Sequence, residues 1–109
     1  MSDELLGFWE NGADDSSGLH GIWGFGIEFL EGGEGFDHNW RPNIKEEERK
    51  QKINWRRDGE KLVSIRFNGD EEWDEIEYEI TVYDRVWLRL TEKGKDEFWC
   101  APESLYKRI

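Results

Sequence analysis

Cysteine and histidine are scarce in this 109-residue sequence, and long hydrophobic runs are absent. The single cysteine, Cys100, excludes an intrachain disulfide framework. No apolar run reaches the length of a signal peptide or a membrane span, and the chain opens with the acidic segment Met1–Glu4. We therefore expect a cytoplasmic protein, and the length predicts one domain, residues 1–109, with a modest core.

The two histidines give little support for catalysis. His20 falls in an expected loop, and His38 falls beside Asp37 in an expected strand. Neighbours in a strand point to opposite faces, so His38 and Asp37 cannot form a dyad without a bulge. A metal-assisted enzyme remains an alternative if the loop folds back and both histidines share an ion with Asp14, Asp15 or Asp37.

Other patterns of chemistry are also missing. Cys100 is in phase with Phe98 on an expected strand, which predicts a buried thiol, and no neighbouring histidine marks it as a nucleophile. Gly24–Gly26 and Gly32–Gly33 lack the lysine or helix of a phosphate-binding loop. We therefore expect no enzyme activity, no cofactor and no metal.

Aromatic residues, in contrast, are abundant: the chain has seven Trp, six Phe and three Tyr. Hydrophobic residues make up only 36% and charged residues 38%, a balance that by itself favours disorder. Disordered chains are poor in aromatic residues, which bury large areas when they pack. The composition therefore predicts a folded domain with an aromatic core and a densely charged exterior.

Acidic residues outnumber basic ones, 26 against 15, and the formal net charge is -11. Such a surface repels nucleic acid and anionic membranes and attracts basic partners. The same charge also serves to keep a tryptophan-rich domain in solution. Composition leaves both explanations open.

The stretch Glu75–Leu90 has the clearest periodicity. Apolar and polar side chains alternate on both sides of Tyr83–Arg85, which is typical of two half-buried strands. A three-residue turn there keeps the apolar face continuous, whereas a two-residue turn mixes the faces. It also sets Glu79 opposite Arg89 on the outer face. The predicted apolar pairs are Val82 with Val86, Ile80 with Leu88, and Tyr78 with Leu90.

Similar short runs occupy most of the remaining sequence, separated by Gly, Asp and Asn turns. About eight of them, without a convincing long helix, predict an all-β fold: an antiparallel up-and-down meander forming a small barrel or a strongly curved half-barrel. The charged run Lys45–Lys52 fits a helical turn or an exposed strand extension. The expected strands are Leu5–Glu10, Gly21–Leu30, Phe36–Trp40, the runs around Ile53–Trp55 and Val63–Phe67, the two arms of Glu75–Leu90, and Glu97–Cys100, with Ser104–Ile109 closing the chain as a strand or a helical turn.

The segment Gly7–Trp9 matches the Gly-x-Trp opening of the lipocalin-like (calycin-type) β-barrels, a family that the chain resembles. In that family a basic residue near the C-terminus packs across the tryptophan, and the resemblance implies Arg108 for this role. It also implies a small barrel and a transport function. The later residues that are similar to the family's meander are Trp55, Leu62, Tyr78, Ile80, Leu88 and Leu90.

An acidic cluster leads into the first arm of the central hairpin. Its seven carboxylates fall within ten residues that include no basic residue: Asp70, Glu71, Glu72, Asp74, Glu75, Glu77 and Glu79. Strand geometry places the last three on one outer face. Trp73 lies within the cluster, and an aromatic side chain ringed by acid is typical of a surface that binds a basic protein. The alternative is a solvated sheet face that Arg85 and Arg89 partly neutralise.

The sequence favours a non-enzymatic acidic protein that binds a basic protein partner. One concrete form is an inhibitor or immunity protein that covers the basic active site of a nuclease toxin. The alternative is a lipocalin-like carrier of a small apolar ligand, in which aromatic side chains line a cup rather than fill it. The candidates for that cup are Trp9, Trp23, Phe25, Trp40 and Trp55, together with Phe29 and Phe67.

Overall fold

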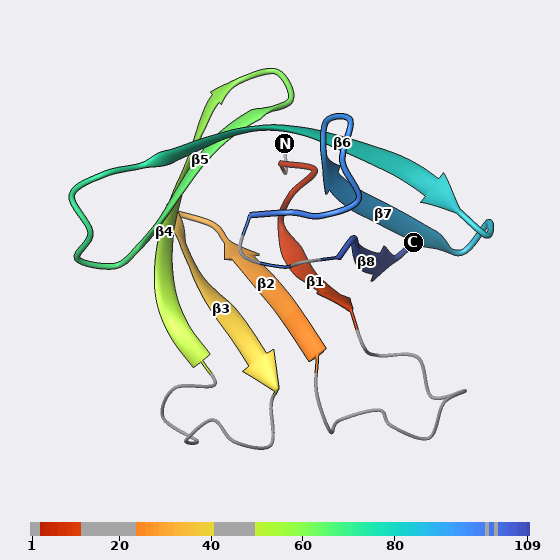
Figure 1. The fold of residues 1–109 in the computed structure, drawn as a ribbon, viewed down its shortest axis with the longest axis horizontal. Helices are drawn as coiled ribbons and strands as arrows, with labels where there is room; N and C mark the ends of the chain where they lie inside the picture. Colours follow the sequence, from red (N-terminus) through yellow and green to blue (C-terminus); the bar gives the residue numbers. More distant parts are fainter. Residues whose placement is uncertain (1–2, 12–23, 41–49, 100, 102) are drawn as a thin grey trace.

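Figure 1 shows eight β-strands that follow one another around a strongly curved sheet. The computed structural model describes residues 3–11, 24–40, 50–99, 101 and 103–109, apart from the side chain of Trp40. The strands are β1 (Gly7–Asn11), β2 (Gly24–Leu30), β3 (Glu34–Trp40), β4 (Lys50–Gly59), β5 (Leu62–Phe67), β6 (Asp74–Tyr83), β7 (Trp87–Glu92) and β8 (Leu105–Arg108).

Each strand pairs antiparallel with the next, and β8 returns to β1, so the sheet closes on itself. The predicted fold, an antiparallel up-and-down meander of about eight strands in a small barrel, is confirmed. The ring is uneven, because β1 pairs with β2 along its whole length but meets β8 only where Glu10 faces Tyr106. No helix in the described ranges is long and apolar enough to cross a membrane.

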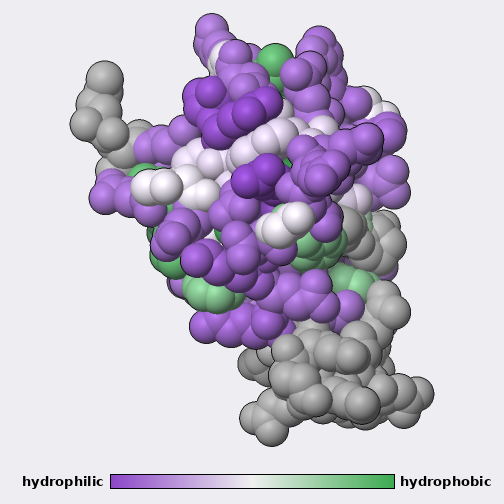
Figure 2. All heavy atoms as spheres, turned by 90° about the vertical axis from the view of Figure 1, so that its left-hand side faces the viewer, coloured by the Kyte–Doolittle hydropathy of each residue, from purple (hydrophilic) through white to green (hydrophobic). Residues whose placement is uncertain are grey.

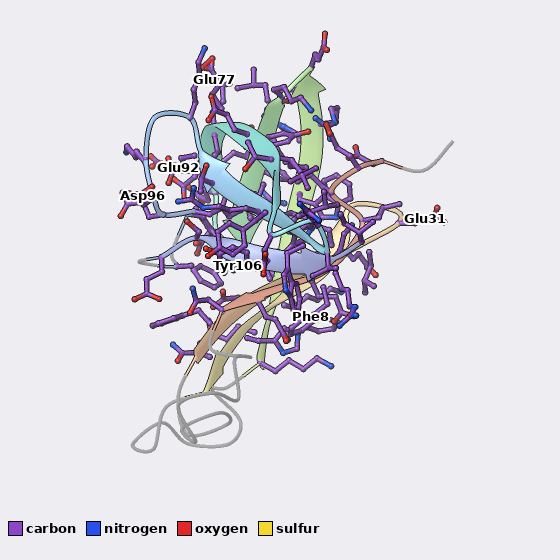
Figure 3. All side chains as sticks on the ribbon, turned by 90° about the vertical axis from the view of Figure 1, so that its right-hand side faces the viewer. Phe8, Glu31, Glu77, Glu92, Asp96 and Tyr106 are labelled. Carbon is purple, nitrogen blue, oxygen red and sulfur yellow. The ribbon has the colours of Figure 1, made fainter. Side chains whose placement is uncertain are left out.

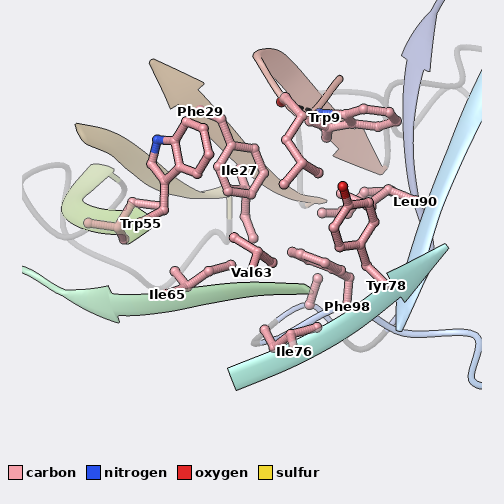
Figure 4. Close-up of a cluster of buried hydrophobic side chains, with 14 of the residues drawn as sticks. Trp9, Ile27, Phe29, Trp55, Val63, Ile65, Ile76, Tyr78, Leu90 and Phe98 are labelled. Atoms are coloured by element: carbon pink, nitrogen blue, oxygen red, sulfur yellow. Dashed lines mark hydrogen bonds between the residues drawn. The ribbon is translucent and has the colours of Figure 1, made fainter. Parts of the chain in front are cut away.

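Apolar side chains from alternate strand positions fill the inside of the ring (Figure 4). Trp9 is completely buried, and its indole N–H donates to the Leu5 carbonyl at 2.8 Å. Phe29 meets Trp55 edge-on, with 5.2 Å between ring centroids. Burying one large apolar side chain contributes about 1.5–3 kcal/mol. The buried residues labelled in Figure 4 are Trp9, Ile27, Phe29, Trp55, Val63, Ile65, Ile76, Tyr78, Leu90 and Phe98.

The turn of the central hairpin lies one residue later than predicted. It comprises Asp84–Val86 instead of Tyr83–Arg85, because Tyr83 stays in the ladder opposite Trp87. Its first two residues adopt positive φ angles of 50° and 65°, the backbone conformation that tight hairpin turns use to match the twist of their strands. The local backbone of the turn therefore fixes the register.

Because of this later turn, each residue of β6 faces a β7 residue two positions later in the sequence than predicted. Because two is the period of a strand, the apolar and polar faces are preserved, and periodicity cannot detect the shift. Glu79 lies opposite Thr91, so the predicted pairing of Glu79 with Arg89 is wrong. The observed apolar pairs are Val82 with Leu88 and Ile80 with Leu90, in place of Val82 with Val86, Ile80 with Leu88 and Tyr78 with Leu90.

The closing strand is β8, and the prediction of a strand at Glu97–Cys100 is wrong. The described part of that segment forms an isolated bridge between Phe98 and Ala101. Trp99 has a positive φ of 50°, so the chain turns there instead of remaining extended. Cys100 itself lies outside the described residues. The segment from Ser104 supplies the last strand, which pairs with both β7 and β1.

The first four strands lie where the sequence places them but differ at their ends. β1 begins at Gly7, because the chain before it turns and the Leu6 N–H donates to the Asp3 carbonyl at 3.1 Å. β4 begins at Lys50, so the end of the charged run Lys45–Lys52 is an exposed strand. The rest of that run lies outside the described residues.

Candidate functional site

The outer side of β6 carries a row of exposed glutamates. Glu75, Glu77 and Glu79 are exposed, whereas Ile76 and Tyr78 between them are buried, so the predicted alternation is confirmed. The connection before the strand is also exposed at its acidic positions. Figure 2 views the side from which this connection projects, and the surface there is largely hydrophilic. We call these seven residues the acidic face: Asp70, Glu71, Glu72, Asp74, Glu75, Glu77 and Glu79.

Few cations among the described residues pair with the acidic face. Glu77 lies 3.6 Å from the Lys93 ammonium, and Asp74 accepts the Trp99 indole N–H at 2.8 Å. The other five side chains form no ion pair with any described residue. Arg89 does not neutralise them, because it binds Asp96 at 2.8 Å. Most carboxylates of the acidic face therefore have no ion-pair partner among the described residues. Figure 3 shows Glu77 of this face on the same side of the barrel as Glu92 and Asp96, which are paired with Lys95 and Arg89.

Trp73 is in contact with two arginines. The guanidinium carbons of Arg56 on β4 and Arg66 on β5 are each 4.3 Å from its ring centroid, and the ring is half-buried. Arg66 also donates to the Asp70 carbonyl at 3.0 Å. We call Arg56, Trp73 and Arg66 the tryptophan clamp. Sequence reasoning missed it, although the arginines stand on outward positions of two predicted strands.

The described aromatic residues that the alternative places around a cup lie in the core or pack against it. Trp9 is fully buried, and Phe25 and Trp55 are 7% and 8% exposed. The Trp55 indole N–H is shared between the carbonyls of Leu30 and Glu34, at 3.0 Å and 2.8 Å. Two further cup candidates are not placed: Trp23 lies outside the described residues, and Trp40 is opposite Gly24 in the sheet but has no described side chain. Phe29 is 1% exposed, and Phe67 is partly buried against the core.

The segment Asp3–Leu6 closes one end of the barrel, and we call it the N-terminal plug. Leu5 within it is fully buried. The Arg57 guanidinium holds the Asp3 carboxylate and the Tyr78 hydroxyl. A shallow depression of about 490 Å³ lies over this end, lined by Asp3, Glu4, Arg57, Gly59, Glu60 and Lys61.

Paired charges tie the plug to the barrel. The Tyr78 hydroxyl donates to the Glu4 carboxylate at 2.8 Å, and the Lys61 ammonium donates to it at 2.6 Å. Burial opposes ionisation of Asp3 and Glu4, but hydrogen bonds to Arg57 and Lys61 outweigh it, so both carboxyl pKa values are lowered. Burial raises the pKa of Tyr78 to about 12. These contacts hold the N-terminal plug against β4 and β6, and each charged side chain in them has a partner.

Lys107, and not Arg108, packs across the Trp9 ring. The Lys107 ammonium is 4.6 Å from the ring centroid and donates to the Leu6 carbonyl at 2.7 Å. Arg108 lies over Trp87 instead, at 5.9 Å, because neighbouring residues of β8 point to opposite faces. The basic residue that packs across Trp9 is therefore one position earlier in the sequence than expected.

His38 and Asp37 lie on a regular strand and point to opposite faces, as predicted. The His38 Nε2 atom is 3.4 Å from a Glu28 carboxylate oxygen, and its ring centroid is 4.7 Å from that of Phe8. Burial lowers the pKa of His38. His20 lies outside the described residues. Within the part of the chain that the structure describes, no three His, Cys, Asp or Glu side chains gather as metal ligands.

Fold and site together define a small closed antiparallel barrel with a buried aromatic and aliphatic core and an acidic face whose carboxylates are mostly unpaired among the described residues. Comparisons with protein-family models, with curated proteins and with solved structures gave no significant match.

Proposed function

We propose that this chain is a non-enzymatic, cytoplasmic binding protein whose acidic face engages a basic protein. The observation that carries the proposal is the row of exposed glutamates on β6, of which only Glu77 has an ion-pair partner among the described residues. The net charge of -11 adds long-range attraction for a basic partner and accelerates encounter. The concrete form is an inhibitor or immunity protein that covers the basic active site of a nuclease toxin.

An apolar tip next to the acidic face supports the same proposal. β6 extends past the core, so Val82 and Tyr83 are 67% and 52% exposed, and Val86 in the turn is 42% exposed. Ile109 is 67% exposed, and its N–H donates to the Val86 carbonyl at 2.9 Å. Tyr83 follows Glu79 by four residues on the same face, about 13 Å along the strand. Exposed aromatic and aliphatic groups beside charge are the usual anchors of a protein interface.

A kinship with the lipocalin-like barrels is part of the proposal. It is supported by the Gly-x-Trp segment in β1 and by the Lys107 ammonium over the Trp9 ring. The burial of Trp9, Phe25 and Trp55 supports a structural role for these aromatic residues, and so favours protein binding over transport of an apolar ligand.

The decisive experiment compares two variants of equal net charge. One changes Glu75, Glu77 and Glu79 to Gln, and the matched control changes the exposed Glu31, Glu60 and Glu103 to Gln. A basic partner, first of all a toxin encoded beside this gene, is titrated against both variants and wild type over a range of salt concentrations.

We expect the β6 variant to bind about tenfold more weakly or worse, mainly through slower association, and the control to stay within about threefold of wild type. Wild-type affinity should fall steeply with salt. Binding that ignores salt, or that both variants weaken equally, would contradict the acidic face as the docking surface. Failure to isolate any basic partner from the native cell would count against the proposal as a whole.

A further inference from the structure

The outer half of β6 forms an open edge of the sheet. β5 pairs with β6 only as far as Glu77, which lies opposite Leu62, whereas β7 pairs with β6 as far as Tyr83. In Figure 1 this half of β6 extends beyond β5, with β7 along one side of it. Residues 79–83 therefore have a strand of the described chain on one side only, and we call their other side the open edge.

The backbone groups of the open edge belong to Ile80 and Val82. The Tyr78 N–H donates to the Lys61 carbonyl at 3.0 Å, on the side of β5. Strand residues two apart direct their backbone groups to the same side, so those of Ile80 and Val82 also point away from β7. They form no hydrogen bond with a described residue there. The open edge thus presents N–H donors and carbonyl acceptors at the spacing that an added strand requires.

Most residues of this half of β6 are exposed to solvent. Val82 and Tyr83 are 67% and 52% exposed, and Glu79 and Thr81 are exposed as well. Natural sheets usually protect an exposed edge with lysine, proline or a β-bulge. Residues 79–83 contain neither lysine nor proline, and β6 pairs with β7 without a break in register. An unprotected extended edge is the kind of site at which a segment of another protein adds to a sheet.

The side chains beside the open edge select the kind of strand that fits. On the outer face Glu79 continues the acidic row of β6, so a basic residue opposite it forms an opposite-charge pair. On the other face Ile80 and Val82 favour apolar neighbours. A second copy of this chain is disfavoured, because each copy carries a net charge of -11. We infer that an extended segment of the basic partner, with basic and apolar residues in alternation, adds to the open edge as a further strand. The inference rests on the proposed function and specifies how the partner is held.

The first test uses a short capped peptide of alternating lysine and valine as the probe. Two analogues carry N-methyl groups on every second backbone nitrogen, one on the lysines and the other on the valines. Only one edge of an added strand faces β6, so one analogue should bind about tenfold more weakly than the parent or worse, and the other should stay within about threefold. Calorimetric titration at low salt measures all three affinities. Equal binding of the two analogues, or no saturable binding of the parent, overturns the inference.

Amide hydrogen exchange locates the bound peptide. In the free protein the amides of Ile80 and Val82 should exchange faster than those of Thr81 and Tyr83, which face β7. Saturation with the parent peptide should slow exchange at Ile80 and Val82 by about tenfold or more, and unchanged exchange there overturns the inference. Protection in the free protein that rises with its concentration would show that a second copy occupies the open edge, and this also overturns the inference.

Variants separate strand addition from attraction by the acidic face. Val82→Pro removes an N–H that points to the open edge, a change that an edge strand tolerates, and Val82→Thr is the matched control that keeps this N–H. The parent peptide should bind the proline variant about tenfold more weakly or worse, and the threonine variant within about threefold of wild type. A proline variant that binds like wild type, with unchanged salt dependence, would overturn the inference and leave the proposed function intact. If the proline variant does not fold, the methylated peptides decide the question on the wild-type protein.

Discussion

At one end of the barrel Arg57 holds Asp3 and the hydroxyl of Tyr78, and the carboxylates there are paired. At the other end Asp37 is half-buried and has no partner among the described residues. The two environments move carboxyl pKa values in opposite directions, down for Asp3 and up for Asp37. The carboxyl groups at the two ends of the barrel therefore make stability depend on pH in opposite directions.

The first prediction concerns Asp37, whose pKa rises through burial from 3.8 to about 6 in the folded protein. The folded state binds this proton more tightly than the unfolded state. The residue therefore lowers the free energy of unfolding as pH rises from about 4 to about 6, and at higher pH this loss stays constant. Asp37→Asn should raise the free energy of unfolding at pH 8 by up to about 3 kcal/mol and change it little at pH 4. Urea denaturation at the two pH values measures the difference. An equal effect at both would contradict the assignment.

The second prediction concerns Arg57. Replacement by Leu leaves Asp3 and the Tyr78 hydroxyl without their partner and should lower the free energy of unfolding by about 1–3 kcal/mol at pH 7. The lowered pKa of Asp3 contributes stability that is present above its ordinary value and is lost as pH falls through the lowered one. The variant should therefore lose less stability than wild type on acidification.

The control for Arg57 is Arg108→Leu, because Arg108 is exposed at the end of β8. Its effect should stay within about 0.5 kcal/mol. Chemical denaturation between neutral and acidic pH gives both results. A variant of Arg57 that keeps the wild-type acid profile would show that the pairing with Asp3 does not contribute to stability.

At the scale of elements, the connection between β5 and β6 is held against the barrel by the tryptophan clamp. Trp73 contacts guanidinium groups from two neighbouring strands, and such contacts contribute about 0.5–1 kcal/mol each at exposed sites. The clamp also fixes where the acidic residues of the connection lie relative to β6. A partner that docks on the acidic face therefore meets carboxylates next to a Trp73 ring that two guanidinium groups contact.

The third prediction tests the clamp. Changing Arg56 and Arg66 to Gln should accelerate amide hydrogen exchange in residues 70–74 several-fold, because the ring loses both stacking partners. Exchange in β2 and β3 should remain at wild-type rates. Arg85→Gln, in the exposed hairpin turn, is the matched control and should change neither region. Unchanged exchange in residues 70–74 of the double variant would contradict the clamp.

At the scale of the whole molecule, the ring has a weak seam. β8 meets β1 at the single pair Glu10 and Tyr106, whereas β2 and β3 pair over seven residues each. The Lys107 contacts with Trp9 and Leu6 reinforce the seam from the side. Fewer ladder hydrogen bonds predict that opening begins there, because local stability follows the bonds that must break.

The fourth prediction follows from the seam. Native-state hydrogen exchange should give β8 a lower opening free energy than β4 and β5. Lys107→Met should lower the β8 value further, by about 1 kcal/mol, and leave β3 unchanged. Exchange of β8 only through global unfolding would contradict the prediction, because it would show that the contact between β1 and β8 is as stable as the other strand pairs.

Particular residues show how far sequence reasoning reached the fold and the candidate site. The exposure of Glu75, Glu77 and Glu79 was predicted correctly, because alternation with Ile76 and Tyr78 leaves one arrangement that buries the apolar side chains. The predicted register of the hairpin was wrong by two residues. A shift of two leaves every side chain on the same face of the sheet, so alternation cannot detect it. The choice of Arg108 over Lys107 failed for a related reason: one residue of phase in β8 decides which side chain meets Trp9.

The sequence by itself determined the class of fold, since alternating runs and Gly, Asp and Asn turns are local signals that each short segment carries. It also determined the charge of the outer face of β6. Tertiary structure alone decided which residues from different segments meet: Arg56 and Arg66 beside Trp73, and Arg57 with Asp3. The physical reason is that closure of the ring and the register of its strands depend on long-range pairing, which local periodicity does not specify.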